Sequence, residues 1–90
     1  MEYVITFKNT NFAIKAEQIL LADRLRVTVM PLPSQIKAGC GICLRINPEQ
    51  IGSALKILKS NHIGETVIYL KRVDNNRTSF QEIVDSAILM

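Results

Sequence analysis

Cys40 and Cys43 are the residues of this chain whose type and spacing could do chemistry, and they lie in the sequence Cys-Gly-Ile-Cys. Two cysteines at this spacing can act as a redox dithiol, supply half of a metal site, or combine one working thiol with one buried thiol. A thioredoxin-type dithiol needs its first cysteine at a helix N-terminus, where the helix dipole lowers the thiol pKa. Aliphatic, strand-like residues follow Cys40 instead, and an extended segment separates two thiols poorly for bridging. The sequence therefore disfavours a dithiol without excluding it.

A metal site has too few candidate ligands. A structural zinc ion normally takes four ligands, and the chain offers the two cysteines and His62. His62 has a simpler explanation as a polar residue in the turn after a helix. We therefore expect neither a metal nor another cofactor.

The surroundings of the two cysteines differ. If residues 42–46 form a strand, Cys43 points away from the neighbouring aliphatic residues and fills apolar space, as free cysteines usually do. Cys43 remains a candidate second thiol. Cys40 lies before that strand, in a loop between Gly39 and Gly41, and the backbone N–H groups of such a loop can stabilise an anion.

Lys37 lies three residues before Cys40 and adds a positive charge to the same loop. Pro31 and Pro33 stiffen the entrance of the loop, because they restrict its conformations in the unfolded chain. These conditions favour a thiolate and make Cys40 the candidate reactive residue. The alternative is a glycine-rich turn that holds an inert cysteine.

Size and composition limit the class of protein. A chain of 90 residues forms one domain, and 48% apolar and 21% charged residues are typical of a globular protein. The net charge of +3 is spread along the chain and lacks the basic stripe with aromatic residues that nucleic-acid binding requires. No apolar run is long enough to span a membrane, and the N-terminus has no signal-peptide pattern. We expect a cytoplasmic protein that binds neither nucleic acid nor membranes.

Apolar periodicity and turn residues predict four strands and two helices in the order β-α-β-β-α-β. The second helix has strong start signals, with Asn47 as the cap and Pro48 at the first helical position. This order predicts an α+β protein with a ferredoxin-like sandwich, in which both helices cover one face of an antiparallel sheet. The predicted strands are residues 3–7, 26–30, 42–46 and 66–70, and the predicted helices are residues 11–22 and 47–60.

The other face of this sheet is too apolar to remain wet, and the tail offers a cover. Ser79 and Glu82 match a capping box, and apolar residues follow at helical spacing, so we expect a helix over residues 79–89. The predicted division is a ferredoxin-like sandwich over residues 1–73, followed by a turn and amphipathic helix over residues 74–90. The helix either folds over the open face or joins a second subunit, and the open face itself is the other candidate for a homodimer contact.

The segment from Pro31-x-Pro33 to Cys40-Gly41, together with Phe12-Ala13 to Glu17, resembles the selenium/sulfur carrier protein-like family of small bacterial proteins. The resemblance covers about residues 3–72. Ser34 and Lys37 stand where family members commonly carry an Arg and a Ser.

The resemblance implies a non-enzymatic carrier, in which Cys40 accepts sulfur or selenium as a persulfide-type group from a donor protein and passes it to an acceptor. The alternative is a small-molecule-binding or regulatory module without thiol chemistry, because a ferredoxin-like fold does not fix a function. Thiol reactivity separates these alternatives. A carrier needs one fast-reacting cysteine, a regulatory module needs neither cysteine to react, and a dithiol oxidoreductase, the third possibility, needs both.

Overall fold

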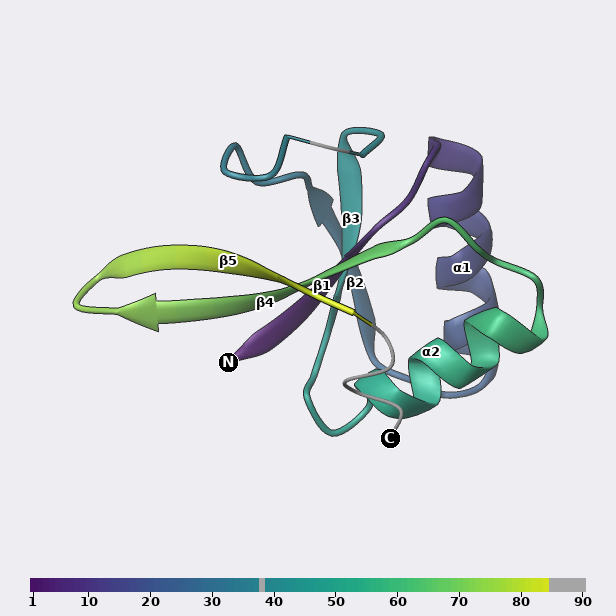
Figure 1. Cartoon of the computed structure of the whole chain (residues 1–90). Helices are drawn as coiled ribbons and strands as arrows, with labels where there is room; N and C mark the ends of the chain where they lie inside the picture. The colour runs from purple at the N-terminus through teal and green to yellow at the C-terminus, as the bar shows by residue number, and fades with distance from the viewer. Residues whose placement is uncertain (38, 85–90) are drawn as a thin grey trace.

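A computed structural model describes residues 1–37 and 39–84 and contains two α-helices and one five-stranded sheet (Figure 1). The strands lie in the order β2-β3-β1-β4-β5, and every neighbouring pair is antiparallel. The predicted α+β class is confirmed. The strands are β1 (Glu2–Thr6), β2 (Val27–Pro31), β3 (Ile42–Ile46), β4 (Val67–Asp74) and β5 (Arg77–Ile83), and the helices are α1 (Thr10–Ala22) and α2 (Ile51–Ser60).

The two helices begin in different ways. Asn9 caps α1, because its side-chain oxygen accepts a hydrogen bond of 2.9 Å from the Phe12 N–H. The predicted cap of α2 at Asn47 is wrong, since α2 begins at Ile51 after a turn and no side chain caps its first turn. The side-chain oxygen of Gln50 accepts instead from the Arg26 N–H at 3.0 Å. Gln50 therefore joins α2 to the segment before β2.

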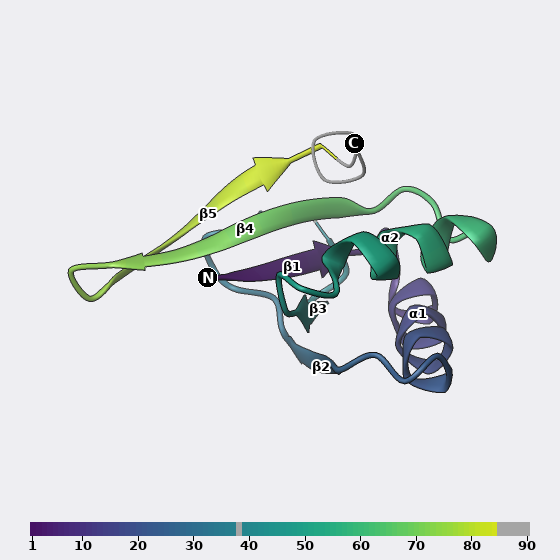
Figure 2. The same ribbon diagram turned by 90° about the horizontal axis from the view of Figure 1, so that it is seen from below.

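Both helices lie on one side of the sheet (Figures 1 and 2). Side chains alternate between the two faces of a strand, so every second apolar residue of β1, β3 and β4 meets the helices. This alternation is the one that the sequence predicts. The buried residues of this helix-side core are Ile5, Phe7, Ala13, Ala16, Leu20, Leu44, Ile46, Ile51, Ala54, Leu55, Leu58, Ile63 and Ile68.

The opposite face of the sheet holds a second, smaller core. Val4 and Cys43 are buried there beneath Ile36, which comes from the loop between β2 and β3. Partly buried apolar side chains surround them, namely Met30, Leu32, Tyr69 and Phe80. The loop therefore covers this face, in the role that the sequence assigns to a tail helix.

The predicted helix over residues 79–89 is wrong for the part that the structure describes. Residues up to Ile83 form β5, which pairs with β4 in a hairpin, and residues 85–90 lie outside the described residues. Asn75 and Asn76 make the two-residue turn with φ values of 48° and 63°. Asparagine tolerates this conformation, which a type I′ hairpin turn requires at both positions. Phe80 is half-buried as a strand residue.

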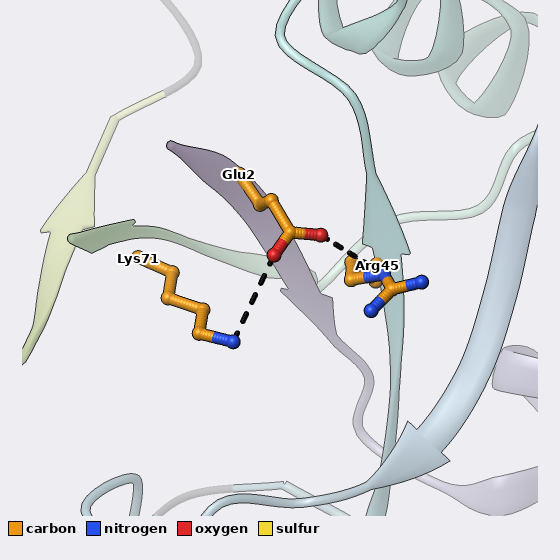
Figure 3. A network of polar contacts seen from close by, with 3 residues as sticks. All are labelled: Glu2, Arg45 and Lys71. Atoms are coloured by element: carbon orange, nitrogen blue, oxygen red, sulfur yellow. Dashed lines mark ion pairs between the residues drawn. The ribbon is translucent and has the colours of Figure 1, made fainter. Parts of the chain in front are cut away.

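Charged residues occupy one end of the second face, beyond its apolar part. The Glu2 carboxylate lies 2.9 Å from Arg45 Nε and 3.7 Å from Lys71 Nζ (Figure 3). The three residues come from adjacent strands β1, β3 and β4. Such partly exposed pairs each contribute at most about 1 kcal/mol, so the network marks the polar border of the face and adds little stability.

Candidate functional site

The loop that carries the first cysteine is fixed at both ends and in its middle. The Leu32 N–H donates to the Gly41 carbonyl at 2.9 Å, which closes the loop where β2 and β3 begin to pair. The Ile36 N–H donates to the Pro33 carbonyl at 3.0 Å and forms a turn. Ile36 is only 5% exposed, so its side chain anchors this turn on the sheet.

Glycine is required on both sides of Cys40. Gly39 has a φ of +129° and Gly41 a φ of +98°, both in a region that other L-residues rarely adopt. A Cβ on Gly39 would also lie 3.4 Å from a methyl group of Leu32. A Cβ on Gly41 would meet no atom within 4 Å, so only the backbone conformation demands glycine there. The two glycines let the chain bend sharply around Cys40 before it enters β3.

Cys40 is half-buried at the end of this loop. Its side chain packs against the helix-side core, and its Sγ–H donates to the Ile42 carbonyl at 3.6 Å. Within residues 1–37 and 39–84, this thiol thus bonds to a carbonyl acceptor and accepts no hydrogen bond from a backbone N–H. Attack by the Cys40 sulfur requires the thiol to leave this carbonyl.

Cys43 lies in a different environment, inside β3. It is 0% exposed within the second core, and its Sγ lies 3.7 Å from the Met30 carbonyl and 3.8 Å from the Pro31 carbonyl. Burial raises the pKa of the Cys43 thiol to about 11, and the nearby Cys40 adds to the rise. Cys43 is therefore a neutral, shielded thiol at neutral pH.

The other residues predicted for the site have different positions relative to Cys40. Pro31 is the last residue of β2 and pairs with Ile42, so it holds the loop entrance against the strand that follows Cys40. Pro33 accepts the hydrogen bond of the loop turn. Lys37 is exposed, and no polar contact joins it to Cys40 among the residues that the structure describes.

A hollow beside Gly39 was not foreseen from the sequence. It has a volume of about 240 Å³ and lies where β1 ends and β4 begins. Lys8 and Glu65 line it and form an ion pair of 3.2 Å. No local pattern joins these residues, because the fold brings them together from distant parts of the chain. The remaining lining residues are Thr6, Phe7, Gly39 and Val67.

Neither a metal cluster nor a membrane helix is found in the described ranges 1–37 and 39–84. No three His, Cys, Asp or Glu side chains there are grouped so that they could hold a metal ion. His62 is exposed, with a φ of 60°, in the turn that follows α2. No helix within the same ranges has the length and apolar character needed to cross a membrane.

Comparison with known proteins identifies the class of this chain. The family model described as "Putative Se/S carrier protein-like" matches residues 2–70, which extend from β1 into β4 and include the loop with Cys40. The chain belongs to this family, as the resemblance of its Pro-x-Pro and Cys-Gly segment predicts. Searches of curated proteins and of solved structures gave no match.

Proposed function

We propose that this protein carries sulfur or selenium as a persulfide-type group on Cys40. The group would come from a donor protein and pass to an acceptor protein. Two findings support the proposal: the chain belongs to a family named for selenium and sulfur carriage, and it has one half-buried thiol between the exposed Gly39 and Gly41. Because the chain only holds the group between partners, it acts as a carrier and not as a catalyst.

The transfer is an exchange between a thiolate and a persulfide. The Cys40 thiolate attacks the outer sulfur of a donor persulfide, R–S–SH. A new S–S bond forms at Cys40, the S–S bond of the donor breaks, and the donor leaves as the thiolate R–S⁻. The terminal S–H stays on the transferred sulfur, so no external oxidant or reductant is needed. Attack by an acceptor thiolate on the same outer sulfur then regenerates Cys40, and terminal selenium follows the same steps.

The observation that carries the proposal is the difference between the two thiols. Only a thiolate attacks, and the pKa of Cys43 near 11 together with its complete burial leaves almost none of it reactive. Cys40 lies instead beside an exposed bend whose glycines present no side chains to an approaching partner. One working thiol is what a carrier requires.

The fold proposed here is a ferredoxin-like sandwich with β5 as an addition. The order β2-β3-β1-β4, with every pair antiparallel and both helices on one face, supports this assignment. In this arrangement the loop with Cys40 joins β2, at one edge of the sheet, to β3. The hollow next to Gly39 provides space in which a group of a partner protein can approach the loop.

Persulfide loading tests the proposal. The full chain is treated with glutathione persulfide, the small molecules are removed, and the intact mass is measured before and after reduction with dithiothreitol. We expect the native chain and Cys43→Ala to gain one reducible sulfur atom, and Cys40→Ser to gain none. Loading that persists in Cys40→Ser, or that is lost in a folded Cys43→Ala variant, contradicts the proposal. An unloaded native chain with two inert thiols favours the binding module.

A further inference from the structure

The two edges of the sheet differ in how well they are protected against further pairing. Strand β2 forms one edge with five residues and ends at Pro31, which has no N–H to offer. Strand β5 forms the other edge with seven residues and contains no proline. Among the described residues, only β4 pairs with β5. Natural sheets usually shield a long edge with proline, charges or a covering segment. The described part of β5 has neither proline nor a covering segment, and its charged residues are Arg77 at its start and Glu82 near its end.

The outer half of the hairpin also lacks support from the rest of the sheet. Strand β1 pairs with β4 only as far as Glu2 and Lys71. Beyond that point Arg72 to Ser79 pair only with one another, and the hairpin extends past the other strands (Figure 1). A two-stranded ribbon alone is at best marginally stable in water. A further strand on β5 would therefore stabilise the hairpin.

The hairpin register determines which backbone groups are available to such a strand. Asp74 and Arg77 flank the two-residue turn and form the first pair of the ladder. In a hairpin of this type the flanking residues exchange hydrogen bonds, and the bonding direction then alternates along the strand. The backbone groups of Thr78, Phe80 and Glu82 are consequently directed away from β4.

We propose that a second copy of this chain pairs its β5 antiparallel with this edge, with Phe80 on the two-fold axis. Phe80 is the middle residue of β5, so this register overlaps the whole strand and uses all three outward-directed residues. It forms about six main-chain hydrogen bonds. Phe80 lies opposite its own copy, and Thr78 lies opposite Glu82 of the second copy, as a self-complementary interface requires. No like charges face each other, and two aromatic rings meet at the centre.

This dimer is independent of the chemistry proposed for Cys40. The family match ends at residue 70, so β5 lies outside the matched segment. The loop between β2 and β3 reaches across the second face as far as the core that Phe80 borders, but Cys40 packs at the helix-side core. Pairing through the backbone edge of β5, at the opposite edge of the sheet from β2, therefore leaves Cys40 accessible in both copies. The dimer can therefore be tested whether or not Cys40 carries sulfur.

Charge substitutions at Thr78 test both the interface and its register. Thr78 faces the neutral Val73 within the chain and Glu82 of the second copy in the dimer. The dissociation constant of the full chain is measured by sedimentation velocity over a concentration series. Because each change acts twice per dimer, we expect Thr78→Lys to tighten the dimer roughly two- to thirty-fold and Thr78→Glu to weaken it to a similar extent. Circular dichroism confirms that each variant is folded.

A charge exchange provides the matched control. The double variant Thr78→Glu with Glu82→Lys places opposite charges across the interface in the reverse order, so it should dimerise as tightly as Thr78→Lys and more tightly than the native chain. A native chain that stays monomeric at millimolar concentration overturns the proposal. Dimerisation that is equal in the Thr78→Lys and Thr78→Glu variants also overturns it, because the contact then lies elsewhere.

Discussion

Cys40 and Cys43 are only three positions apart, yet the chain places them in opposite environments. Cys40 follows a bend at Gly39 and packs at the margin of the helix-side core. Cys43 is one residue inside β3 and points to the other face, where the loop covers it. The difference shows that CxxC spacing alone does not define a dithiol. The backbone between the two cysteines decides whether they act together, and here a bend followed by a strand separates them.

Removal of the loop anchor should have the largest effect on this difference. Ile36→Ala leaves a cavity above Cys43, so we expect a loss of about 2–4 kcal/mol in the free energy of unfolding and faster labelling of Cys43. Urea unfolding and native-state alkylation measure the two effects. Ile14→Ala is the matched control, because Ile14 is 44% exposed and its loss should cost less than about 0.5 kcal/mol. An unchanged labelling rate in Ile36→Ala would mean that the loop does not shield Cys43.

The raised pKa of Cys43 predicts a loss of stability at high pH. The folded chain holds this proton more tightly than the unfolded chain, since the pKa rises from 9.0 to about 11. The contribution is therefore complete below pH 9 and is lost as the pH rises toward 11, by up to roughly 3 kcal/mol. Urea unfolding at pH 8, 9, 10 and 11 measures the loss. Cys43→Ala should show a shallower decline, and equal slopes in the two proteins would contradict the assignment.

A substitution in the bend around Cys40 should have a smaller effect on the free energy of unfolding. Gly41→Ala places a Cβ on a residue with a φ of +98°, and we expect it to cost about 1–2 kcal/mol. Gly52→Ala is the control, because a Cβ there also meets no atom within 4 Å but the backbone is helical. This change should stabilise the chain by up to about 1 kcal/mol. Thermal unfolding compares the two variants, and a neutral Gly41→Ala would show that the bend does not depend on glycine.

The first four strands, both helices and the two faces of the sheet could be predicted, because they depend on local periodicity. Residues 42–46 coincide with β3, and alternation along that strand predicts the burial of Cys43. The tail could not be assigned by the same argument. Phe80 and Ile83 are three residues apart, a spacing that suits a helix, and the Ser79 and Glu82 pair resembles a cap. Asn75-Asn76 was the informative signal, since two adjacent asparagines suit a hairpin turn.

Part of the site depends on long-range contacts that no local pattern reveals. In the sequence Ile36 is an ordinary loop residue, and only the folded structure shows that it packs over Val4 and Cys43. The hollow beside Gly39 likewise combines Lys8 and Glu65 from different elements. Lys37 is a different case. Its proximity along the chain predicts a positive charge near Cys40, and among the described residues no polar contact joins the two side chains.

The most direct test of the difference between the two thiols is the alkylation rate of each cysteine in the native chain at pH 7.5. Cys43→Ala and Cys40→Ser report the two thiols separately, with iodoacetamide as the reagent and intact mass as the readout. We expect Cys40 to react much faster, because the rise in the pKa of Cys43 from 9.0 to about 11 lowers the thiolate fraction of Cys43 roughly 100-fold and the loop shields it in addition. Cys43 should react at an ordinary rate only in urea. Equal native rates, or a faster Cys43, would contradict the assignment of Cys40 as the one reactive thiol.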